Sequence, residues 1–128
     1  MSNQLEHYPV LYPDGRWEWI CTERDKMLEA FHLAIDCDML EGVSLPWGIC
    51  GVVDECGKIK ANPQQVNHYA SRLYPGTLYG DPLVGPVVFC RIALVDEEYD
   101  WVPPTVQQLI TLGMVTGIPV PRHPLLDV

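Results

Sequence analysis

The tetrapeptide Tyr12-Pro13-Asp14-Gly15 is a turn signal that separates two short segments with strand-like patterns. The segment after it, residues 16–21, is rich in aromatic and β-branched residues and alternates polar and apolar residues at its start. Strands joined by so short a turn pair antiparallel, so we expect residues 8–11 and 16–21 to form a β-hairpin. Because proline lacks an amide hydrogen, we expect Pro9 to place the first strand at a sheet edge.

Three further segments have strand patterns. They are residues 41–45, which stop at Pro46; residues 49–53, which are apolar throughout; and residues 83–90, where Pro86 marks a strand start or a bulge. A fully apolar strand is covered on both faces, so we expect 49–53 near the centre of the sheet. Gly57 follows it, and a glycine there can take the positive φ of a tight hairpin turn.

Three segments have the periodicity of amphipathic helices. The first is expected over about 23–35 with a capping box of Thr22 and Asp25, the second from Asn62-Pro63 to Pro75-Gly76, and the third from Pro104-Thr105 to Gly113. The residues expected to face the core are Met27, Leu28, Phe31, Ala34 and Ile35 in the first; Val66, Tyr69, Ala70 and Leu73 in the second; and Val106, Leu109 and Ile110 in the third.

The resulting order, β-β-α-β-β-α-β-α, favours an α+β fold. We expect a small antiparallel or mixed sheet of about five strands, with two to three helices packed on one face. The length of 128 residues fits one domain with its own core, expected over residues 1–113. Residues 114–128 are expected to be an extended or disordered tail, because its prolines exclude a helix.

The acidic composition excludes some classes of function. Eight Lys and Arg residues stand against 17 Asp and Glu, for a net charge of −9, so direct binding of DNA or RNA is not expected. No segment has 18 consecutive apolar residues, and the N-terminus lacks a secretory pattern. We therefore expect a cytoplasmic protein without membrane contact.

The five cysteines, at positions 21, 37, 50, 56 and 90, include no Cys-x-x-Cys pair. Cys50 and Cys56 are too far apart for a zinc knuckle, and in a reducing compartment free cysteines in apolar stretches act as small hydrophobes. We expect structural cysteines, no metal site and no cofactor.

No pattern of catalytic residues stands out. Asp54 and Glu55 are interpreted as a solvated turn, although a carboxylate pair also suits acid–base work or Mg²⁺. The spacing of Asp36, Asp38 and Glu41 does not fit a calcium loop.

The surroundings of the histidines in the sequence also give no indication of catalysis. Neither His32 nor His68 lies near a nucleophile motif, and no glycine-rich phosphate loop is present. We therefore expect no enzyme activity.

The densest polar feature is the run Asp96-Glu97-Glu98-Tyr99-Asp100-Trp101. One interpretation is a solvated loop. The other is a contact surface for a basic patch on a partner protein, because aromatic anchors ringed by charge are typical of interfaces. The candidate partner-binding residues are Asp96, Glu97, Glu98, Asp100 and Trp101, and Trp17, Trp19 and Trp47 either add to this surface or belong to the core.

Short motifs over about residues 27–112 resemble an uncharacterised family, a domain of unknown function common in actinobacteria and their phages. They are Ala34-Ile35-Asp36-Cys37, Glu41-x-Val43-x-Leu45, Val53-Asp54-Glu55-x-Gly57, Asn67-x-x-Ala70-x-x-Leu73 and Leu83–Phe89. The Trp17/Trp19 hairpin and the tail lie outside the pattern. The resemblance implies a small cytosolic accessory protein, often carried by phages or mobile elements, and supplies no catalytic residues.

Two hypotheses follow. In the first, the chain is a non-enzymatic module that binds a host protein through its acidic surface, where nucleic acid would otherwise sit. In the second, it binds or sequesters a small molecule such as a nucleotide signal. That alternative requires cations and an aromatic group to converge, with Arg72, Arg91, Lys58, Lys60 and Tyr69 as candidates.

Overall fold

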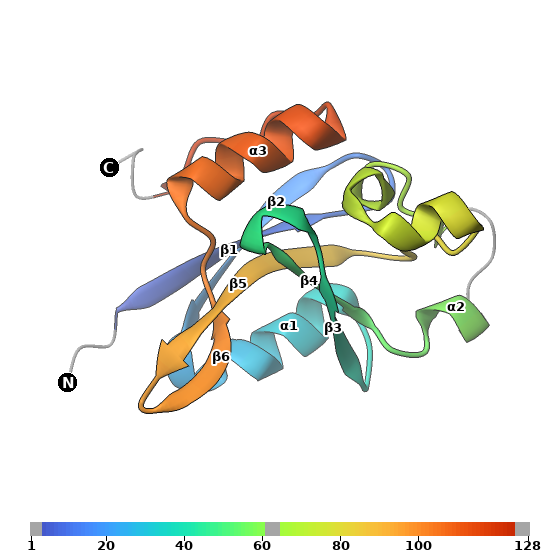
Figure 1. Cartoon of the computed structure of the whole chain (residues 1–128). Helices are drawn as coiled ribbons and strands as arrows, with labels where there is room; N and C mark the ends of the chain where they lie inside the picture. The colour runs from blue at the N-terminus through green and yellow to red at the C-terminus, as the bar shows by residue number, and fades with distance from the viewer. Residues whose placement is uncertain (1–3, 61–64, 125–128) are drawn as a thin grey trace.

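The computed structural model of the chain describes residues 4–60 and 65–124. Within those ranges, six strands form one antiparallel sheet, and helices pack on it, which confirms the expected α+β class (Figure 1). The strands are β1 (Leu5–Leu11), β2 (Trp17–Glu23), β3 (Leu40–Ser44), β4 (Cys50–Asp54), β5 (Val87–Val95) and β6 (Glu98–Val102). The α-helices are α1 (Met27–Ile35), α2 (Gly57–Lys60) and α3 (Val106–Thr116).

The strand order is β2-β1-β5-β4-β3, and β6 pairs with the second half of β5. The expected β1–β2 hairpin and the internal position of β4 are confirmed. The edge position of β1 was wrong, because β1 lies between β2 and β5. Pro9 is tolerated there because the ladder between β1 and β5 includes only Val10 and Leu11, so Pro9 lies beyond its end.

Helices cover both faces of the sheet, not one face as expected. Val87 and Phe89 belong to one hydrophobic cluster, and Val88 and Cys90 belong to another. Because successive side chains of a strand point to opposite faces, this alternation makes β5 the divider between two half-cores. Helix α1 packs on one side, and α3 packs on the other beside a 3₁₀ helix at Ala70–Leu73 (Figure 1).

Helix α1 buries the stripe of Met27, Phe31 and Ile35 as expected, while Leu28 is exposed. The predicted start of this helix was wrong. Thr22 remains in β2 and its hydroxyl donates to the carbonyl of Glu23, so the expected capping box with Asp25 does not form. A short 3₁₀ turn, Arg24–Lys26, leads into α1 instead.

The region after β4 also differs from the expectation. Gly57 does not have a positive φ and begins α2 in place of a hairpin turn. Asn62 and Pro63, expected to start the second helix, lie outside the described residues. Val66 then forms an isolated bridge with Val84.

A single buried side chain explains why residues 65–73 are not an α-helix. The Asn67 amide donates to the carbonyls of Leu11 (2.9 Å) and Gly85 (3.0 Å), and its oxygen accepts from the backbone N–H of Ala70 (3.0 Å). Such side-chain bonds compete with helical backbone bonds. Ala70 and Leu73 still reach the core, through the 3₁₀ helix, and Val66 and Tyr69 are half-buried.

Strand β5 starts after Pro86 and is longer at its far end than the expected 83–90. Helix α3 begins as expected, with a capping box of Thr105 and Gln108, but it ends at Gly117 and not at Gly113. It therefore continues past residue 113, the expected domain boundary.

Helix α3 also faces the core differently than expected. Val106 and Ile110, expected inward, are 74% and 52% exposed, whereas Leu112 and Thr116 are buried. The tail packs on the same half-core through Ile118, whose carbonyl accepts from the Trp17 indole (2.9 Å).

Candidate functional site

The acidic run is the tip of a hairpin formed by β5 and β6, not a loop (Figure 1). Asp96 and Glu97 form its turn with φ values of 50° and 70°, and Glu98 begins β6. Two central residues with positive φ are typical of type I′ turns, whose twist suits a two-residue hairpin. All three carboxylates are exposed.

One face of this hairpin is apolar. Ile92 is the register partner of Trp101, and Leu94 is the partner of Tyr99, so these four side chains share a face. We call them the hairpin strip. Tyr99 is 76% exposed and Leu94 is 62% exposed, while Trp101 is half-buried. The strip thus runs from the core out to the acidic tip.

Trp101 anchors the strip. Its ring stacks on Phe31 of α1 with centroids 6.0 Å apart. Gly42 of β3 makes room for it, because a Cβ there would lie 3.0 Å from the indole ring. Grooves of about 580 Å³ and 230 Å³ both have Trp101 and Ile92 among their lining residues.

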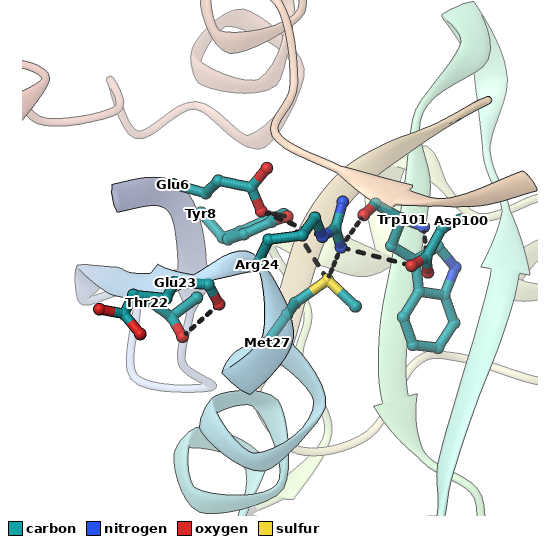
Figure 2. Close-up of polar contacts among 8 residues, drawn as sticks. All are labelled: Glu6, Tyr8, Thr22, Glu23, Arg24, Met27, Asp100 and Trp101. Atoms are coloured by element: carbon teal, nitrogen blue, oxygen red, sulfur yellow. Dashed lines mark hydrogen bonds and ion pairs between the residues drawn. The ribbon is translucent and has the colours of Figure 1, made fainter. Parts of the chain in front are cut away.

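Arg24 fixes the base of the hairpin (Figure 2). Its Nη2 donates to the carbonyl of Trp101 (2.5 Å) and lies 3.6 Å from the carboxylate of Asp100. Its Nε lies 3.5 Å from the carboxylate of Glu6, which also accepts from the Tyr8 hydroxyl (2.9 Å). Burial and this hydrogen bond raise the pKa of Tyr8 far above its ordinary value. Arg24 therefore connects the start of β1 to β6.

The charges of the hairpin fall into two groups. Asp100 is paired with Arg24, but Asp96, Glu97 and Glu98 form no ion pair with any residue that the structure describes. The acidic tip, defined as these three residues, therefore presents unneutralised charge beside exposed apolar side chains. Trp17, by contrast, is part of the core, and Trp47 is exposed on the turn before β4.

Among the side chains that the structure describes, the candidates for small-molecule binding do not line one groove together, and the side chain of Lys60 lies outside the described part. The Arg72 guanidinium lies 5.9 Å from the ring centre of Tyr69 and donates to the carbonyl of Thr116 (2.8 Å). Arg91 donates to the carbonyl of Pro103 (3.0 Å). Lys58 pairs with Asp81 and lines a small groove at the end of β4, but neither arginine lines that groove or the two grooves at Trp101. The small-molecule hypothesis stays a prediction.

Three further observations concern the described residues. An apolar groove of about 790 Å³ runs between α3 and the tail, lined by Val106, Leu109, Ile110, Gly113, Met114, Gly117, Pro119, Val120, Pro121 and His123. Among the described residues, no three His, Cys, Asp or Glu side chains are grouped as metal ligands, and no helix is long and apolar enough to cross a membrane.

The cysteines are not all buried. Cys50 and Cys90 are buried partners in the β4–β5 register, and their mutual hydrogen bond lowers the pKa of Cys50 and raises that of Cys90. Cys21 is exposed, and its sulfur lies 3.3 Å from Nε2 of His7. The sequence pattern drew attention only to His32 and His68, so this pair was missed. The register fixed by the Tyr12–Gly15 turn, which sets His7 opposite Cys21, was the signal that would have found it.

Comparison with known proteins gives one match. A family model described as a domain of unknown function, DUF3846, matches residues 10–112. The match includes the Trp17/Trp19 hairpin, which the resemblance had left outside its pattern. No protein of curated function and no solved structure matches the chain.

Proposed function

We propose that this chain, which belongs to the domain-of-unknown-function family DUF3846, is a non-enzymatic module that binds a basic partner protein through its β5–β6 hairpin. The observation that carries the proposal is that an acidic surface and an exposed apolar surface lie next to each other on this hairpin. The acidic tip bears three carboxylates that form no ion pair within the described part of the chain, and the adjoining hairpin strip exposes Leu94 and Tyr99.

Each part has a separate physical role in binding. Exposed apolar and aromatic side chains supply the area that a partner removes from water, and tyrosine and tryptophan are enriched at such contacts. Unpaired carboxylates steer a partner of opposite charge and disfavour acidic competitors. Because Trp101 and Arg24 hold the hairpin base, the surface is preorganised and little ordering is needed on binding.

The finer proposal concerns source and partner. We propose a cytoplasmic accessory protein carried by a phage or mobile element, whose partner is a host protein with a basic, nucleic-acid-binding patch. The net charge of −9 supports a basic partner, since like-charged surfaces repel. No catalytic step is part of the proposal, because the exposed tip does not enclose a substrate as active sites do.

The test is affinity capture from a bacterial lysate with matched charge variants. The hairpin variant is Asp96→Asn/Glu97→Gly/Glu98→Gln, and the control is Asp36→Asn/Asp38→Asn/Glu55→Gln. Both sets remove three exposed carboxylates, so the two variants have equal net charge. We expect a basic protein that is captured by the wild type and the control but not by the hairpin variant.

Kinetics with the purified partner complete the test. Association should slow as the ionic strength rises, because the screening length falls to about 8 Å near physiological salt. Capture that is equal for both variants, or association that does not respond to salt, would contradict the proposal.

A further inference from the structure

The β1–β2 hairpin carries a thiol–imidazole pair that the proposed function does not use. His7 and Cys21 are register partners, and the sulfur lies 3.3 Å from Nε2. We propose that Cys21 is a reversible modification site, a nucleophilic thiol that exchanges with small disulfides while His7 accepts its proton.

The two groups differ in exposure in the way this chemistry requires. Cys21 is exposed and therefore open to a reagent from solution, whereas His7 is only 6% exposed. Burial lowers the pKa of His7, and the nearby His123 lowers it further. The imidazole of His7 is therefore neutral at pH 7. With its ring proton on Nδ1, the neutral ring presents an unprotonated Nε2 to the thiol. The thiolate, not the thiol, is the nucleophile.

Neighbouring aromatic rings position the base. The ring of His123 meets that of His7 edge to face at 4.7 Å and that of Trp19 at 5.1 Å. Trp19 lies two residues before Cys21 and therefore on the same face of β2. Its indole nitrogen is buried and has no hydrogen-bond partner in the described ranges, so the Trp19 ring takes part in this cluster through ring packing alone.

The co-reactant class follows from the surroundings. Cys21 is exposed and is not among the lining residues of the groove beside α3 or of the grooves at Trp101, so a small disulfide can reach its sulfur directly from solution. The Cys21 thiolate attacks one sulfur of a disulfide RS–SR; the new S–S bond forms as the old one breaks, and RS⁻ leaves. The proton held by His7 passes to the leaving thiolate. The products are a mixed disulfide on Cys21 and one RSH, and a second thiol reverses the step.

The test uses 5,5′-dithiobis(2-nitrobenzoic acid) in limiting amount at pH 7, with modified peptides identified by mass spectrometry. In the wild-type chain we expect Cys21 to be modified before the half-buried Cys56. His7→Gln should slow labelling of Cys21 by about tenfold or more, since general-base assistance has at least that size. The control, His68→Gln, changes an exposed histidine outside the cluster and should leave the rate unchanged.

Each outcome decides the proposal. Modification of Cys56 at the rate of Cys21 in the wild type, or an unchanged rate in folded His7→Gln, would overturn it. Circular dichroism of each variant verifies the fold, and the wild-type comparison stands without any variant.

Discussion

Trp101 stacks on Phe31 with ring centroids 6.0 Å apart and ring planes inclined by 26°, so the acidic hairpin rests directly on the core. Phe31 lies on the buried face of α1 and is fully buried, while Trp101 is half-buried and belongs to the hairpin strip. Packing in this half-core therefore sets the position of the proposed binding surface.

Phe31→Ala is expected to lower the free energy of unfolding by about 3–5 kcal/mol, because it opens a cavity under Trp101. Leu33→Ala is the control, since Leu33 lies on the same helix and is 77% exposed. It should change stability by no more than about 0.5 kcal/mol. Urea unfolding measures both, and equal effects would show that α1 buries a different face.

Arg24→Met is expected to destabilise the chain by about 1–3 kcal/mol, because it leaves the Trp101 carbonyl and the Glu6 carboxylate without their charged partner. The matched change Arg16→Met removes a pair with Glu18 that is exposed on both sides. Its effect should stay below about 1 kcal/mol. Denaturant midpoints test this, and limited proteolysis should cut the hairpin faster in Arg24→Met only.

The sequence pattern predicted the elements whose structure depends on residues close together in the chain. The turn at Tyr12–Gly15 and the period of Met27, Phe31 and Ile35 gave the first hairpin and the buried face of α1. The acidic hairpin was harder, because carboxylates are depleted in strands and the run resembles a loop. Its pairing comes from Ile92 and Leu94 of β5, an extension of the strand beyond the predicted end.

Two features that the sequence pattern did not predict depend on residues far apart in the chain. Asn67 prevents a helix by bonding to the carbonyl of Leu11, 56 residues away in the sequence. Arg24 contacts Trp101 across a separation of 77 residues. The periodicity of a short segment carries no information about such long-range contacts. The base of the candidate site was therefore not predictable from the sequence pattern.

Asp96→Asn/Glu97→Gly is expected to stabilise the hairpin turn. Both residues have positive φ, and glutamate there costs about 1 kcal/mol relative to glycine, while Asn-Gly is the preferred pair of a type I′ turn. The melting temperature should therefore rise or stay constant although two charges are lost. A clear fall would show that the turn does not have this geometry, and any binding loss of the hairpin variant would then reflect unfolding.

The histidine cluster makes stability depend on pH. Burial lowers the pKa of His7 in the folded state, so between that pKa and the ordinary value of 6.5 the unfolded chain binds more protons. Stability from this group is present above pH 6.5 and is lost as the pH falls through the folded pKa. We expect His7→Gln to flatten the stability profile between pH 7.5 and about pH 5.5, whereas the exposed-site control His68→Gln should keep the wild-type slope. Urea unfolding at a series of pH values measures it, and parallel profiles for all three chains would contradict it.

The orientation of α3 gives the last prediction. Leu112 is fully buried against the half-core that also holds Trp17, whereas Ile110 faces the apolar groove and is 52% exposed. Leu112→Ala should therefore cost about 2–5 kcal/mol of unfolding free energy, because it leaves a cavity that the strands cannot fill. Ile110→Ala removes a side chain that remains half in water, and its cost should stay below about 1.5 kcal/mol. Thermal and urea unfolding of the two variants measure the difference directly. If Ile110→Ala is the more damaging change, α3 instead packs on the core through the face expected from the sequence, which contains Val106 and Ile110. The apolar groove between α3 and the tail would then not be open to solvent.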